Sequence, residues 1–193
     1  MFTDLFQSVD FTYFFLSALL FFAGMYFGPF AVERNIRFLL MYPRWMLRFT
    51  RRIFTHEVNP LGLFLLILLL NNLSVMTSFL SGLLVILPPF AAFFTGFNVA
   101  VIGFEMLGWR GIWQILFNPV AWLEFPAAFL GFSMAYQLAE VQLTYADWSL
   151  TLATLTSLLP IYLKYVFTLL FAAAVLETSL IAHGRHIPED DET

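Results

Sequence analysis

The chain has 193 residues, of which 61% are hydrophobic and 11% charged, and its net charge is −4. A soluble domain carries roughly 25% charged residues, and a chain of this length cannot hide so much apolar surface inside a soluble globule. These numbers exclude an ordinary soluble enzyme, and the absence of cysteine excludes a disulfide scaffold and a cysteine nucleophile. The negative net charge argues against a nucleic-acid partner. The composition therefore predicts a protein whose solvent is a lipid bilayer.

Stretches without charge predict about five transmembrane helices. The longest, 58–104, would measure about 70 Å as a helix, which is two crossings of a ~30 Å hydrocarbon core. Pro88 and Pro89 place the turn between these crossings near 81–90, and residues 149–159 are too few to make a separate crossing. The predicted spans are 10–31, 60–81, 88–107, 119–139 and 157–182. We therefore expect the whole chain to form a single all-α polytopic transmembrane bundle.

The basic residues orient these spans, because loops on the cytoplasmic side of a membrane carry the excess of Lys and Arg. Counting outward from the basic segment 33–57 puts eight of the nine cations on the cytoplasmic side, and the ninth, Lys164, lies within a span. The segments on the other side contain no Lys or Arg: 1–10, 82–88 and 140–150. We expect a multi-pass cell-membrane protein with its N-terminus outside and its acidic tail, 183–193, in the cytoplasm.

The basic segment has the spacing of an amphipathic helix. Trp45, Phe49 and Ile53 recur every four residues, and Pro43 is allowed in the first turn of a helix that begins there. Arginines follow a similar spacing and are expected to contact anionic lipid headgroups: Arg44, Arg48, Arg51 and Arg52. The segment is therefore predicted to lie as a helix on the inner leaflet between the first and second spans; the alternative is a loop that only orients the protein.

Polar side chains within the spans form the candidate site, because in lipid they are costly unless they face other helices or a hydrated cavity. These side chains are Asn71, Asn72, Asn98, Glu124 and Glu177. Asn71 and Asn98 each lie about 15 Å from the ends of two helices that a tight turn joins, near the middle of the bilayer. We therefore expect a hydrogen bond between these two amides, worth roughly 0.6 kcal/mol.

Glu124 and Glu177 are the most informative of these residues. Both are predicted at one depth, roughly 8 Å from the cytoplasmic boundary. Two carboxylates there cannot both stay charged without a proton, a cation or a basic partner. Glu105 and Arg110 lie on the same side and are candidate partners. Two interpretations stay open: a proton or cation relay, or a neutralised polar clamp that fixes helix packing.

Enzyme signatures are missing, since the sequence contains no phosphate-binding glycine loop, no HExxH and no GxSxG. We therefore expect no catalytic residue, no metal and no cofactor. Small residues recur at helical spacing, as in Gly24 and Gly28 of the first span and Ala127, Gly131 and Ala135 of the fourth. Because such faces let helices approach closely, they predict a compact bundle, contacts with other membrane proteins, or self-association as a dimer.

Residues 55–182 resemble the stage II sporulation protein M family of polytopic membrane proteins. The resemblance rests on three motifs that occur in the family's order: Asn71-Asn72, Pro119 to Ala127, and Glu177. The second motif is similar to the family's Pro-His-Gly-x-x-Glu-x-Pro-Ala, with Glu124 at the position of the Glu. Val120 and Ala121 stand where the family has His and Gly, so no role that requires this His is implied here.

The resemblance implies a membrane scaffold, since the family's namesake recruits a cell-wall-degrading machine during engulfment. Related proteins occur in bacteria and archaea that never sporulate, so a role in sporulation is not implied. We therefore expect a non-enzymatic scaffold or subunit of a membrane complex in the cell envelope. The alternative is a small permease or transporter subunit with a polar path for a proton, an ion or a solute, lined by Asn71, Asn98, Glu124 and Glu177.

Overall fold

A computed structural model describes residue 5 and residues 8–54 and 59–184, apart from the side chains of residues 50–54. Every element in this part of the chain is helical, which confirms the predicted all-α fold. The helices are α2 (Phe11–Glu33), α3 (Arg37–Phe54), α4 (Pro60–Leu80), α5 (Leu87–Leu107), α6 (Trp109–Phe117), α7 (Ala121–Tyr145), α8 (Trp148–Ile161) and α9 (Phe167–Gly184). A 3-10 turn, η1 (Ser81–Leu83), follows α4, and a π-helical segment, η2 (Tyr162–Val166), joins α8 to α9. All but the first two residues of the predicted acidic tail lie outside the described residues.

Helices long and apolar enough to cross a membrane are present, as the charge-free stretches predicted. Among the described residues, four qualify: Phe11–Glu33, Pro60–Leu83, Leu87–Leu107 and Trp148–His183. A fifth candidate arises if α6 and α7, which are bent by 81° relative to each other, together form one broken span. The expected bundle of about five apolar helices therefore agrees with the observed helices.

Polar side chains at the helix N-termini explain where several helices begin. The Asp10 carboxylate accepts a hydrogen bond from the backbone N–H of Thr12 at 2.7 Å, and the Asp147 carboxylate caps α8 in the same way. Asn59 caps α4, whose first residue is Pro60. Proline is well suited to this position because the first N–H of a helix has no partner within the helix.

Two predicted boundaries on the C-terminal half of the chain are wrong. The last apolar helix begins at Trp148 and not at residue 157, and it continues for 36 residues through η2 to His183. The predicted external loop 140–150 is mostly helical, because α7 continues to Tyr145. Charged and polar residues such as Glu140 were interpreted as a loop signal, but Glu and Gln are good helix formers.

The amphipathic helix between the first two spans also begins earlier than predicted. α3 starts at Arg37, so Pro43 lies within the helix and not in its first turn. The short helix α6, between the third and fourth predicted spans, was not predicted. Its signal was the helical spacing of Trp109 and Trp113, which both stay exposed.

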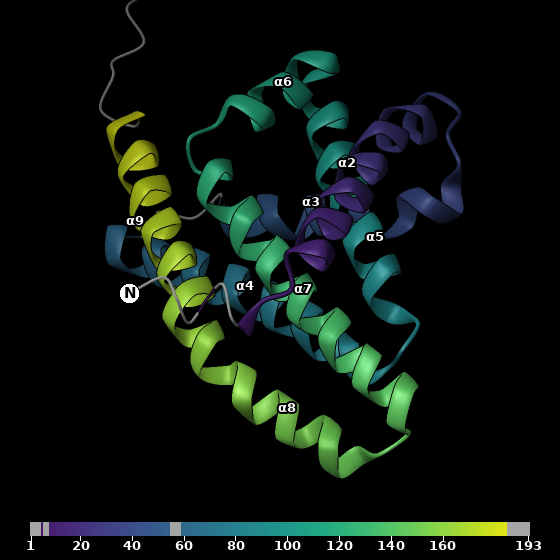
Figure 1. Ribbon diagram of the computed structural model, residues 1–193. Helices are drawn as coiled ribbons and strands as arrows, with labels where there is room; N and C mark the ends of the chain where they lie inside the picture. Colours follow the sequence, from purple (N-terminus) through teal and green to yellow (C-terminus); the bar gives the residue numbers. More distant parts are fainter. Residues whose placement is uncertain (1–4, 6–7, 55–58, 185–193) are drawn as a thin grey trace, which may run out of the picture.

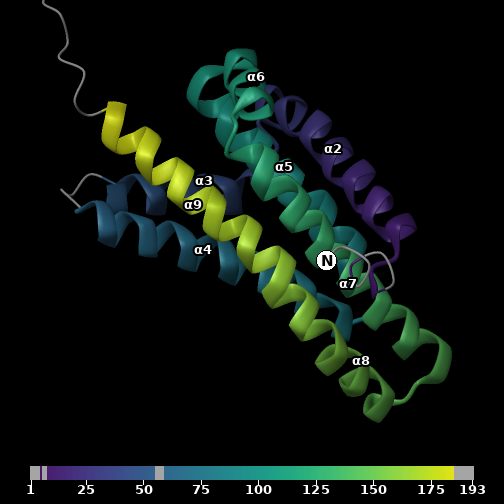
Figure 2. The same ribbon diagram turned by 60° about the vertical axis from the view of Figure 1, so that its left-hand side comes forward.

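The helices form two packed pairs with α7 between them. α2 lies along α5, and α4 lies along α9, while α7 contacts members of both pairs. Figures 1 and 2 show both pairs from two directions. Much of α7 is buried, including Phe132, Met134 and Leu138. Although η1 and a short turn join α4 to α5, α5 packs mainly on α2, so the predicted close hairpin of α4 and α5 is wrong.

Glycines allow the closest helix contacts within the bundle. A Cβ on Gly96 of α5 would lie 1.9 Å from the backbone oxygen of Phe21, and a Cβ on Gly24 of α2 would lie 2.0 Å from that of Phe93. Gly82 meets the backbone of Ala135 in α7 at similar range. The small-residue faces that predicted tight packing or a dimer therefore pack against other helices of the same chain.

Candidate functional site

A hydrogen bond between Asn71 and Glu124 lies at the centre of the candidate site. The Nδ2 group of Asn71, on α4, donates a hydrogen bond to Oε1 of Glu124, on α7. Both side chains are half-buried. The bond predicted between Asn71 and Asn98 does not form; Asn98 lies on α5, which packs against α2.

The α6–α7 bend determines where Glu124 lies. Pro119 disfavours helical backbone at Asn118, whose Oδ1 accepts a hydrogen bond from the backbone N–H of Val120 at 3.0 Å. The indole N–H of Trp122 donates to the backbone oxygen of Leu116 at 3.1 Å and holds the two helices in this arrangement. Glu124 consequently lies in the first turn of α7, where the partial positive charge of a helix N-terminus stabilises a carboxylate.

Asn72 joins a third helix to the same point. Its Oδ1 accepts a hydrogen bond from the hydroxyl of Tyr162 at 3.0 Å, and the Tyr162 side chain is completely buried. Tyr162 is the first residue of η2, and π-helical turns are frequent at functional sites. The neighbouring asparagines therefore connect α4 to α7 and to the α8–α9 helix. The sequence did not single out Tyr162, although a tyrosine within a long apolar stretch signals a hydroxyl that needs a partner.

Glu177 of α9 lies near the same group of polar side chains, Asn71, Asn72 and Glu124. Both acids that were predicted at one depth therefore belong to this cluster. Glu177 is half-buried and close enough to Glu124 for their charges to interact electrostatically. A cavity of about 140 Å³ borders the Asn71–Glu124 pair and also receives Ser74 and Thr95. This volume is large enough to admit water. The cluster can therefore hold water and a proton, or a weakly bound cation, between helices.

The described residues contain no group of three or more His, Asp or Glu side chains that could hold a metal ion. Two carboxylates and an amide are fewer ligands than divalent cations take in dedicated protein sites.

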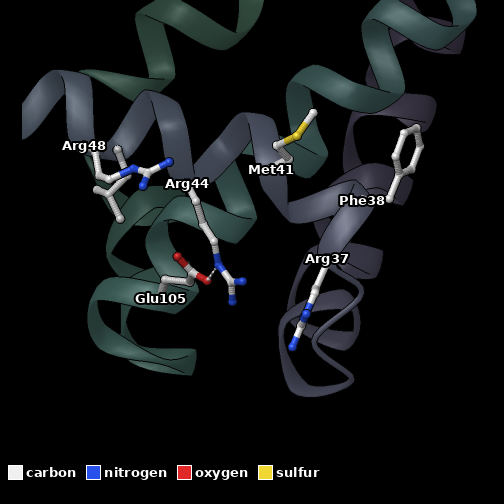
Figure 3. A pocket seen from close by; sticks show the side chains of 7 residues that line it. Arg37, Phe38, Met41, Arg44, Arg48 and Glu105 are labelled. Carbon is white, nitrogen blue, oxygen red and sulfur yellow. Dashed lines mark hydrogen bonds and ion pairs between the residues drawn. The ribbon is translucent and has the colours of Figure 1, made fainter.

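The remaining predicted site residues lie elsewhere. Glu105 forms an ion pair with Arg44, with Nε and Oε1 2.6 Å apart (Figure 3). Arg44 also donates a hydrogen bond to Oδ1 of Asn35 at 3.2 Å. Arg110 is exposed. Arg110 therefore does not neutralise Glu124 and Glu177 as predicted. Glu105 is neutralised instead by Arg44, in a contact between α3 and α5 that the sequence did not predict. Of the arginines expected at lipid headgroups, Arg51 and Arg52 have side chains outside the described residues.

Comparison of the chain with protein-family models, curated proteins and solved structures gives no match. The resemblance to the stage II sporulation protein M family therefore stays a prediction.

Proposed function

We propose that the chain is a non-enzymatic, multi-pass membrane protein that serves as a scaffold or subunit of a membrane complex. Its N-terminus would lie outside the cell membrane and its C-terminus in the cytoplasm, as the distribution of Lys and Arg indicates. The family resemblance supports the same role.

One observation carries the proposal of a partner. Of the four candidate spans, Pro60–Leu83 has the smallest share buried in the protein, 22%. Leucines spaced four residues apart along α4 are each more than half exposed: Leu61, Leu65, Leu69 and Leu73. Such a ridge suits a partner helix, which would pack its own ridges beside it. The glycine faces are already occupied within the chain, so this ridge is the surface that we assign to another membrane protein or to a second copy.

A photo-crosslinking amino acid in place of Leu69 tests this assignment in native membranes. We expect one discrete protein adduct, identifiable by mass spectrometry as a partner or as the chain itself. The matched control replaces Tyr26, which is 76% exposed on α2, and should give no protein adduct. Adducts with lipid alone at Leu69 would contradict the proposal, as would the same protein adducts at both positions.

A transporter subunit is the second candidate, and the bent pair α6–α7 favours it. In many transporters, broken helices line the site for the substrate and its coupling ion. The first turn of α7 carries Glu124, which borders a cavity with Asn71 and lies near Glu177. This arrangement fits proton or cation transfer.

Vesicles that contain the purified protein and a pH-sensitive dye test the transport role. If Glu124 and Glu177 carry the proton, Glu124→Gln and Glu177→Gln should each abolish a proton flux that exceeds that of empty vesicles. Glu140→Gln is the control, because Glu140 is exposed on α7. A flux no greater than in empty vesicles, or one that Glu124→Gln leaves unchanged, would rule out the role.

A further inference from the structure

Three faces of α3 have different surroundings. Leu40 and Pro43 are buried, and Leu40 packs with Phe97 and Val101 of α5. On a second face, an arginine stripe formed by Arg37, Arg44 and Arg48 follows the helical spacing of seven and four residues. On the third face, exposed aromatic side chains form a parallel stripe: Phe38, Tyr42, Trp45 and Phe49. The arginine stripe lies between the body of the protein and the aromatic stripe.

A groove of about 570 Å³ runs beneath the arginine stripe, between α3 and the C-terminal end of α5. Figure 3 shows Arg37, Arg44 and Arg48 along it, with Glu105 opposite Arg44. Met41 lines the groove too. The groove is therefore lined by guanidinium groups and apolar side chains together.

The charges along this groove do not balance. Among the described residues that line the groove, Glu105 is the one acidic side chain, and it neutralises Arg44. No ion pair joins Arg37 or Arg48 to a carboxylate within the described part of the chain. Two positive charges therefore remain, one on each side of the Arg44–Glu105 pair along the helix. Guanidinium groups bind phosphate oxygens through paired N–H donors, so a phosphate is the natural counter-ion here.

Apolar side chains beside these arginines favour a phosphate that is attached to a lipid. Phe38 is 82% exposed and Met41 is 66% exposed, although both line the groove. The aromatic stripe suits the boundary between headgroups and acyl chains, where aromatic rings of interfacial helices lie. We propose that this groove binds anionic phospholipid of the cytoplasmic leaflet. A headgroup phosphate would lie at each of Arg37 and Arg48, which are about 16 Å apart along α3, and the acyl chains would lie along Phe38 and Met41. Arg44, held by Glu105, shapes the groove and keeps α3 on α5.

This inference rests on the proposed membrane orientation and not on the proposed protein partner. Its test is lipid retention by the full-length protein, purified in detergent with equal amounts of phosphatidylglycerol and phosphatidylcholine and measured by native mass spectrometry. We expect bound phosphatidylglycerol to exceed phosphatidylcholine about tenfold, and the double variant Arg37→Gln, Arg48→Gln to lose this preference. The charge-matched control is Arg34→Gln, Arg110→Gln, because both arginines are exposed outside the groove. It should keep the preference.

Three results would overturn the proposal: equal retention of the two lipids, an equal loss in the control variant, or displacement of the lipid by millimolar inorganic phosphate. The last would show a site for free phosphate. Glu105→Gln provides an independent readout if the arginine variant does not fold. Glutamine keeps an Oε1 that can accept from Arg44, so the groove keeps its shape while its negative charge is removed. Retention of phosphatidylglycerol should stay the same or rise, and a decrease in a variant that unfolds at the wild-type temperature would contradict the assigned charge balance. The crosslinking result at Leu69 does not depend on these outcomes, so the two proposals can fail separately.

Discussion

Replacing Gly96 with alanine is expected to force α2 and α5 apart. The added Cβ would lie 1.9 Å from the backbone oxygen of Phe21, and a backbone atom of a packed helix cannot rotate away as a side chain can. The contact runs along most of both helices, so the shift also disturbs the burial of Phe21 and Ala92. We expect a loss of about 3 kcal/mol in the free energy of unfolding, at the upper end for overpacked interiors, measured by thermal unfolding in detergent.

A second variant checks that the effect belongs to this helix contact. Gly24→Ala places a Cβ 2.0 Å from the backbone oxygen of Phe93, in the same α2–α5 interface. The two substitutions should be less damaging together than the sum of their separate effects, because the first already separates the helices. Ala172→Val is the control, since Ala172 is exposed on α9. A Gly96→Ala variant that unfolds at the wild-type temperature would show that α2 and α5 do not approach so closely.

Asn71→Leu is expected to destabilise the bundle by about 2 kcal/mol, because it leaves the half-buried carboxylate of Glu124 without its amide donor. Glu124→Leu should cost a similar amount, since Asn71 then loses its acceptor. The double variant should cost less than the sum, because it leaves neither polar group unsatisfied. Chemical unfolding of all four proteins in mixed micelles gives the coupling energy between the two side chains.

Asn98→Leu serves as the comparison for this cycle. Asn98 is a half-buried amide on α5, outside the Asn71–Glu124 cavity, so its substitution should show no coupling to Glu124→Leu. Additive effects of Asn71→Leu and Glu124→Leu would mean that the hydrogen bond does not stabilise the bundle. A strong coupling would support the interpretation of this pair as a clamp between helices.

Much of the fold could be predicted because apolar length and helix-capping chemistry are local properties. The first span was predicted at 10–31 and is found at Phe11–Glu33, with Asp10 as its cap. Pro88 and Pro89 placed the start of the third span, which is α5, because both prolines fit the first turn of a helix. Errors arose where polar residues sit on helical backbone, as at 140–150, because a polar side chain alone does not end a helix.

The sequence predicted which residues make up the candidate site better than it predicted which of them contact each other. Glu124 and Glu177 were expected at one depth, and they lie close enough for their charges to influence each other. The partner of Asn71 was wrong, because short connections do not require long contact between the helices they join. Arg44 was expected at lipid headgroups, yet the same side chain reaches Glu105, which lies 61 residues further along the chain.

By itself, the sequence determined the bilayer-like composition, the helical class, the approximate spans and the polar residues within them. All of these follow from side-chain chemistry read along the chain. Only the tertiary structure decided that Asn71 meets Glu124, that Asn72 meets Tyr162, and that the glycines of α2 are used inside the chain. The physical reason is that helix pairing depends on how closely backbones can approach and on which hydrogen bonds form across helices. Those interactions join residues far apart in the sequence, so no local pattern specifies them.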